Sequence, residues 1–191
     1  MSKIPKVVSK NVGEWSELYV LMEVADLRKI PMCDASLSPI PGFDLHSSKV
    51  FRPEGELVLG TFVELVDASG KQLAKVTPGE ISRLKSAFKR DLLAAPIGSE
   101  KDRKAKRALA SGNAVLNALK LTQVSENPNK KEDIVLQATD PKTQIGNRAG
   151  FSIKSSLGAT PTLFNASNIR YRIDGMGGGD RRYQCENTNS Q

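Results

Sequence analysis

Apolar residues recur at helical spacing near the start of the chain. Within residues 13–29 they follow i, i+3, i+7 and i+10 spacing, which lines one face of a helix. These positions are Trp15, Leu18, Met22 and Ala25. The pattern predicts an N-terminal helix with one apolar stripe. Residues 1–12, which are polar and basic, are expected to form a loose arm before it.

Two further helices are predicted in the middle of the chain. The run Thr77-Pro78-Gly79-Glu80 places a threonine at the N-cap, a proline at the first helical position and an acid at N3. This capping box is a specific start signal, and the helix should end near Pro96. Ser99 can cap the next helix, which is expected to continue to about Leu119.

Alternating apolar and polar residues predict strands elsewhere. Residues 56–67 and 71–76 flank Ala68-Ser69-Gly70, an arrangement typical of a hairpin with a glycine in its turn. Residues 134–139 and 151–154 form a second pair of short strands, joined by a turn-rich loop.

Other segments carry weaker patterns. Residues 31–48 contain several prolines and glycines and are predicted to be irregular, with a short strand at 48–52. Residues 169–173 alternate well enough to predict a further strand. Residues 174–191 are rich in glycine and polar side chains, so they cannot bury a core and are expected to form a disordered tail.

The order of these elements predicts an α/β fold. A central mixed sheet would carry Asp133 and Lys154, with the N-terminal helix and the two middle helices flanking it. A chain of 191 residues with 39% hydrophobic content can bury a sizeable core in one domain.

Charge and composition limit the classes of function. The net charge of +7 favours a polyanionic partner, and nucleic acid is the first candidate. The two cysteines, Cys33 and Cys185, lack the spacing of a zinc site or a disulfide framework. His46 is the single histidine, which argues against the usual Ser/His/Asp and HExxH sites. No apolar run has the length of a membrane span, and no signal peptide is visible, so a soluble intracellular protein is expected.

Two local motifs were weighed and rejected. Ser82 and Lys85 fit the SxxK pattern of a Ser/Lys hydrolase, but they lie within an amphipathic helix and lack the partner motifs. The run GMGGGD follows a strand, but it lacks the last glycine of a dinucleotide-binding loop and no helix pattern follows.

The 134–139 and 151–154 strand pair carries the most suggestive polar residues. Asp133 opens the first strand and Lys154 lies in the second. A carboxylate beside a lysine on the neighbouring strand can hold a divalent metal and position a water against a phosphate. From spacing alone, an ordinary hairpin with a turn aspartate and a solvated lysine is the simpler interpretation.

Four longer stretches of sequence are more specific indicators of a family than the spacing of Asp133 and Lys154. GFSIKSSLG, PTLFNAS, KKEDI and NVGEWSELYV resemble, in order, segments of the HpaII family of type II restriction endonucleases, and they span most of residues 11–173. The resemblance implies a PD-(D/E)xK nuclease core over residues 1–173, which hydrolyses double-stranded DNA at CCGG with Mg²⁺. It also implies a cytoplasmic protein with two protein partners, a second copy in a homodimer and a cognate DNA methyltransferase. Because the family's chains are longer, a truncated, inactive DNA-binding remnant is the alternative.

The resemblance assigns roles to three residues. Asp133 would be the main metal ligand. Lys154 would orient or activate the water and stabilise the negative charge that develops on the phosphorus centre. Glu17, from the N-terminal helix, would be an auxiliary metal ligand or help to hold the geometry of the site. Ser152 stands where a (D/E)xK enzyme has an acid, so the second carboxylate stays open among Glu17, Glu14 and Asp140.

Candidate DNA contacts fall in two groups. Polar residues around the second strand can donate hydrogen bonds to phosphates; they are Ser152, Ser155, Ser156 and Asn165. Lys104 and Arg107 belong to a basic run that is either a solvated helix face or a phosphate contact.

Overall fold

The computed structural model describes residues 7–33, 38–124, 132–153 and 170–171. A single sheet of eight strands has the order β5-β4-β3-β2-β6-β7-β8, and β1 pairs with β2 beside this path. All strand pairs are antiparallel except β7 and β8, which are parallel. The elements in chain order are α1 (Val12–Leu27), β1 (Lys29–Cys33), β2 (Pro39–Arg52), β3 (Gly55–Leu59), β4 (Val63–Val66), β5 (Gln72–Val76), α2 (Pro78–Leu93), α3 (Glu100–Lys104), α4 (Ala110–Ala118), β6 (Ile134–Thr139), β7 (Gly146–Ile153) and β8 (Arg170–Tyr171). The predicted α/β fold with a mixed sheet and flanking helices is confirmed.

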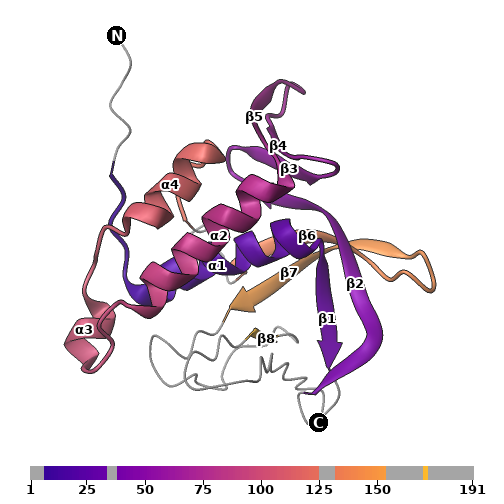
Figure 1. Ribbon diagram of the computed structural model, residues 1–191. Helices are drawn as coiled ribbons and strands as arrows, with labels where there is room; N and C mark the ends of the chain where they lie inside the picture. Colours follow the sequence, from indigo (N-terminus) through magenta and orange to yellow (C-terminus); the bar gives the residue numbers. More distant parts are fainter. Residues whose placement is uncertain (1–6, 34–37, 125–131, 154–169, 172–191) are drawn as a thin grey trace.

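Helix α1 lies at the centre of the molecule, between α2 and the sheet (Figure 1). Trp15 and Tyr19 contact Phe88 of α2, with ring centroids 5.8 and 6.3 Å apart. Val20 and Val24, which helical periodicity places on the opposite side of α1, are also buried. The predicted helix is confirmed, but the single apolar stripe is wrong, because α1 is covered on both sides.

The packing of α1 against α2 and α4 requires a glycine. Gly112 lies in α4, and a Cβ atom at this position would be 2.7 Å from Cζ3 of Trp15 and 3.0 Å from Cε2 of Phe88. Both distances are below ordinary van der Waals contact. The absence of a side chain at residue 112 therefore allows α4 to approach the aromatic pair closely.

The two faces of the sheet differ in character. Val50 of β2 pairs with Leu136 of β6, and both belong to the core beneath α1 together with Phe151 of β7. The adjacent row, Lys49, Gln137 and Arg148, is less buried and lies on the opposite face because side chains alternate along a strand. We call this opposite face the outer face.

The segment predicted to be irregular is in fact strand. Residues 39–52 form the long strand β2, which pairs with β1, β3 and β6. Pro31 lies in β1, which pairs with β2 alone and so can accommodate a residue without an N–H group. The long-range pairing outweighs the local preference of the prolines and glycines.

The helical predictions for the middle of the chain are partly confirmed. Thr77 caps α2 by accepting a hydrogen bond from the Glu80 amide at 3.2 Å, and α2 ends at Leu93 as expected. The single helix expected after Ser99 is wrong, because the chain is extended between α3 and α4. Here Arg107 pairs with Lys10 through two backbone hydrogen bonds of 3.0 and 2.8 Å.

Two smaller predictions also need correction. Residues 56–67 were expected to be one strand, but they form β3 and β4 with a turn between them. The N-terminal arm is anchored from residue 8 onward, because the Val8 backbone exchanges hydrogen bonds of 2.8 and 3.0 Å with the Asn113 side chain. Residues 1–6 and the predicted tail at 174–191 lie outside the described residues. None of the helices in the described ranges is long and apolar enough to cross a membrane.

Candidate active site

Asp133 is held at the point where β6 begins. Its backbone amide donates to the Phe151 carbonyl oxygen at 2.9 Å, so Phe151, which pairs with Ile134, also holds Asp133. Its Oδ2 atom accepts a hydrogen bond from the Ile153 amide at 2.6 Å. The carboxylate is therefore fixed against the end of β7, and the predicted position of an aspartate at a strand opening is confirmed.

Ser152 lies beside Asp133. The two hydrogen bonds of Asp133 to β7 go to Phe151 and Ile153, the residues on either side of Ser152. Ser152 is buried, and alternation places it on the outer face, away from Phe151 and Ile153. The structure thus brings these two residues of the predicted site together.

Several predicted site residues lie outside the described part of the chain. These are Lys154, Ser155, Ser156 and Asn165. Lys154 follows the last described residue of β7, two positions after Ser152 in the sequence. Its predicted role therefore stays a prediction.

Glu17 is half-buried on α1 and approaches the sheet from the other side. Helical spacing groups it with Val20 and Val24. Helix α1 contacts β7 and shares one core with Phe151, whereas Ser152 is on the opposite face of the same strand. The structure does not bring Glu17 onto the face that bears Ser152.

Glu14, the second candidate metal ligand on α1, is hydrogen-bonded at the N-terminus of that helix. Its two carboxylate oxygens accept hydrogen bonds from the Lys10 ammonium at 2.8 Å and from the Asn11 amide at 3.0 Å. Asn11 in turn accepts from the Glu14 amide at 2.8 Å, which completes a capping box. Partial burial alone would raise the pKa of Glu14, but the hydrogen bonds from Lys10 and Asn11 outweigh it, and the pKa is lowered.

Asp140 is a turn residue, which is the role preferred for it from the sequence. Its carboxylate accepts hydrogen bonds from the Lys142 amide at 2.8 Å and from the Thr143 hydroxyl at 3.1 Å, within the loop between β6 and β7. These bonds, the Lys142 amide first, lower the pKa of Asp140. The carboxylate thus organises the turn at the far end of β6 from Asp133.

Glu132 is a carboxylate near the site that the sequence analysis missed. A Cβ atom built on Gly150 would be 2.3 Å from Cγ and 3.4 Å from Cδ of Glu132, so the Glu132 side chain lies directly over Gly150. Gly150 is two residues before Ser152 and therefore on the same outer face. The signal in the sequence was its place next to Asp133 in the KKEDI string.

The available oxygen ligands fit a magnesium ion. Within the described ranges, no group of three or more His, Cys, Asp and Glu side chains is placed to hold a metal. Mg²⁺ does not need such a group, since it is usually held by one or two carboxylates and keeps several waters. Asp133 and Glu132, consecutive acids at the edge of β6, supply hard oxygens of this kind.

The basic cluster around α3 divides into two roles. The Arg107 guanidinium donates to the carbonyl oxygens of Asp102 at 2.8 Å and Pro96 at 3.1 Å, so it holds the chain on either side of α3. Lys104 is exposed in the last turn of α3. Lys104 is thus the better placed of the two for a phosphate contact.

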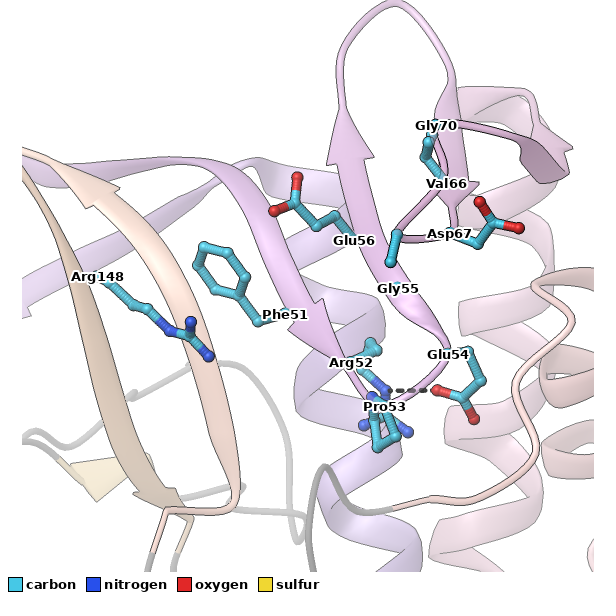
Figure 2. Close-up of a pocket in the computed structure, with 11 residues that line it drawn as sticks. Phe51, Arg52, Pro53, Glu54, Gly55, Glu56, Val66, Asp67, Gly70 and Arg148 are labelled. Atoms are coloured by element: carbon cyan, nitrogen blue, oxygen red, sulfur yellow. Dashed lines mark ion pairs between the residues drawn. The ribbon is translucent and has the colours of Figure 1, made fainter.

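A hollow of about 650 Å³ lies on the sheet between β2, the β3–β4 end and β7 (Figure 2). Arg52 and Glu54 form an ion pair there, and the Arg52 guanidinium donates to the carbonyls of Gln123 and Val124 at 2.6 and 3.0 Å. This arginine anchors the chain after α4 and is not presented to a ligand. Arg148 instead lies over the Phe51 ring, 4.1 Å from its centroid, on the outer face.

The rejection of the Ser/Lys motif is supported by Lys85. Its ammonium group lies 2.9 Å from the Glu23 carboxylate and 2.5 Å from the Asp26 carboxylate. Burial alone would lower the pKa of Lys85, but the hydrogen bonds to Asp26 and Glu23 outweigh it and raise the pKa. A lysine held in its charged form cannot serve as the base that activates Ser82.

Comparisons with known proteins agree with the resemblance noted in the sequence. The model of the HpaII restriction endonuclease family matches residues 11–190. The chain is 29% identical over 182 residues to the type II restriction enzyme HpaII of Haemophilus parainfluenzae. This match covers 86% of the chain and 46% of that enzyme, so the chain spans about half the length of its curated relative. No solved structure matches the chain.

Proposed function

Since the chain belongs to the HpaII restriction endonuclease family, we propose that it is a type II site-specific deoxyribonuclease that hydrolyses double-stranded DNA with Mg²⁺. The observation that carries this proposal is the position of Asp133. Its carboxylate is fixed to the end of β7 beside Ser152, and Lys154 follows two residues later in the sequence. This is the order of acid and lysine that the family resemblance implies for a nuclease site.

The proposed chemistry needs a metal-bound carboxylate and a cation near the scissile phosphate. A bound Mg²⁺ would neutralise charge on the phosphate oxygens and lower the pKa of a coordinated water. Asp133 would hold the metal, because its Oδ2 is already oriented by the Ile153 amide and a carboxylate has further lone pairs for a ligand. Lys154 would orient the attacking water and stabilise the developing negative charge. Glu17, which approaches β7 from the face opposite to Ser152, stays a proposed auxiliary ligand or a residue that helps to hold the geometry of the site.

Double-stranded DNA is the proposed substrate, with CCGG as the target by analogy with the family. The net charge of +7 favours its approach. Lys104 offers an exposed cation, while Arg107 would contribute mainly through the position it gives α3. Ser152, Ser155, Ser156 and Asn165 remain proposed phosphate contacts. The proposal includes a cytoplasmic location, a homodimer and a cognate DNA methyltransferase.

A DNA-binding protein without catalysis is the second candidate. The observation in its favour is that, within the described ranges, no group of three or more His, Cys, Asp and Glu side chains is placed to hold a metal. Both candidates predict salt-sensitive binding to duplex DNA. They differ in whether the bound DNA is hydrolysed in the presence of Mg²⁺.

The test is cleavage of a plasmid that carries CCGG sites. The purified protein should give discrete fragments with Mg²⁺ and none with EDTA, and a plasmid without CCGG should stay intact. Asp133→Asn should abolish cleavage, whereas Asp140→Asn, which removes a turn carboxylate, should not. If the protein binds the duplex but does not cleave it at any Mg²⁺ concentration, the second candidate is favoured and the nuclease proposal is wrong.

A further inference from the structure

The proposed site lacks an acid at the position where most enzymes of this type have one. Ser152 stands two residues before Lys154, and a serine hydroxyl is a poor ligand for Mg²⁺. We infer that Glu132 supplies the missing carboxylate and binds the same metal ion as Asp133. This inference rests on the proposed nuclease function and deepens it.

The first argument is the position of the Glu132 side chain over Gly150. The contact of 2.3 Å between Cγ of Glu132 and a Cβ built at residue 150 means that any side chain there would occupy the space that Glu132 uses. Gly150 and Ser152 share the outer face of β7. Glu132 therefore lies on the same face of β7 as the position of the usual acid, two residues along the strand from Ser152.

The second argument is that the Glu132 carboxylate is not used elsewhere. No hydrogen bond or ion pair joins it to another residue in the described ranges. The competing acids differ in this respect, because Glu14 is bonded to Lys10 and Asn11, and Asp140 to Lys142 and its turn. Within the described part of the chain, the Glu132 carboxylate therefore has no interaction that a bound cation would have to replace.

The third argument is geometric. Asp133 is pinned to β7 through the Ile153 amide, and Glu132 precedes it directly, so both acids are held at the same end of the β6–β7 pair. Glu17 approaches β7 from the side of Phe151, which is the face opposite to Ser152. Of these two acids, Glu132 is the one on the face of Ser152.

The test measures metal binding apart from cleavage. Isothermal titration with Ca²⁺, which fills oxygen sites of this kind, would be performed on the complex of the protein with a CCGG duplex. Glu132→Gln keeps the size of the side chain and removes its charge. We expect it to weaken the apparent Ca²⁺ affinity by about 10- to 100-fold. The matched control Asp140→Asn removes the carboxylate of the turn at the other end of β6 and should leave the affinity unchanged.

The outcomes separate this inference from the function on which it rests. If Asp133→Asn weakens Ca²⁺ binding and Glu132→Gln does not, Glu132 is not a ligand, but the nuclease site stands. If neither substitution changes Ca²⁺ binding, or the wild-type complex binds no Ca²⁺, then both the Glu132 inference and the proposed nuclease site are wrong. Thermal unfolding of each variant, compared with the wild type, verifies that a loss of affinity does not come from a loss of folding.

Discussion

The Asp133 carboxylate accepts a hydrogen bond of 2.6 Å from the backbone amide of Ile153, 20 residues later in the sequence. One side chain thus both closes the pairing of β6 with β7 and presents carboxylate oxygens at their shared end. Structural and chemical roles of Asp133 can be separated by choosing substitutions that keep or remove the acceptor.

Asp133→Ala should destabilise the fold more than Asp133→Asn. Alanine leaves the Ile153 amide without its acceptor, and a hydrogen bond to a charged group contributes about 2 kcal/mol. Asparagine keeps a carbonyl oxygen in place and should cost less than about 1 kcal/mol. Urea denaturation of both variants gives the comparison. Equal losses of stability would mean that the hydrogen bond contributes little.

Gly150→Ala should reproduce the effect of Glu132→Gln on metal affinity. The added methyl group displaces the Glu132 side chain, while alanine suits a strand position whose φ is not positive. We expect a loss of about 10-fold in apparent Ca²⁺ affinity, and no further loss when Gly150→Ala is combined with Glu132→Gln. Gly60→Ala is the control, because its nearest neighbour would be 4.0 Å away. Additive losses would show that Gly150 acts independently of Glu132.

Lys85→Gln should lower the free energy of unfolding by about 2 kcal/mol, since it leaves Glu23 and Asp26 without their partly buried cation. The pKa of Lys85 is raised in the folded protein, so this stabilisation is fully present below the ordinary value of 10.5 and is lost as the pH rises through the folded value. The difference between wild type and Lys85→Gln should be constant from about pH 7 to 9 and shrink above about pH 11.

Thermal melts across this range give the measurement for Lys85. Ser82→Ala is the matched control for the Ser/Lys motif. It removes an exposed hydroxyl and should change neither stability nor any activity. A difference between wild type and Lys85→Gln that grows with pH would contradict the assigned ion pair.

Gly112→Ala should destabilise the fold despite the better helix propensity of alanine. The new Cβ would lie 2.7 Å from Trp15 and 3.0 Å from Phe88, and overpacking of this kind costs about 1 to 3 kcal/mol. The fluorescence of Trp15, the single tryptophan, reports the change directly in a urea titration. Gly79→Ala, at an open position in α2, should instead leave stability equal or slightly higher. A neutral Gly112→Ala would mean that α4 can move away from the aromatic pair.

Lys104→Gln and Arg107→Gln should separate DNA binding from folding. Loss of Lys104 should weaken duplex binding and reduce the slope of log K against log salt concentration by about one. Loss of Arg107 should cost about 1 to 2 kcal/mol of stability, because two carbonyl groups lose their donor. Filter binding at several salt concentrations and thermal melts distinguish the two effects. An unchanged salt slope in Lys104→Gln would remove this residue from the interface.

The features that the sequence predicted well are those with local causes. The cap at Thr77, the extent of α1 and the position of β6 each depend on residues within a few positions of one another. Strand β2 was missed because its pairing partners lie far along the chain and override the local proline signal. The break between α3 and α4 was missed for the same reason, since Lys10 pairs with Arg107 there.

In the candidate site too, features with local causes were predicted and features that depend on distant residues were not. Asp133 was found because an aspartate at a strand opening is a local pattern, and the family strings reinforced it. The position of Glu132 over Gly150 was not predicted, because it depends on a residue of the neighbouring strand that carries no side chain. Glu17 was favoured for its depth in a helix, but only the structure reveals which face of β7 that helix covers.

The central place of α1 has a consequence for how the protein is made. The helix is synthesised early, yet one side waits for α2 and α4 and the other for β7, which follows more than a hundred residues later in the sequence. At about 5 to 20 residues per second, the ribosome needs roughly ten seconds to deliver the last of these partners. Until β7 has been synthesised, the side of α1 that faces β7 stays uncovered even if α2 and α4 have already packed against the other side. Folding of this protein is therefore bound to the completion of β7, and a chain arrested before β7 should aggregate or be held by a chaperone.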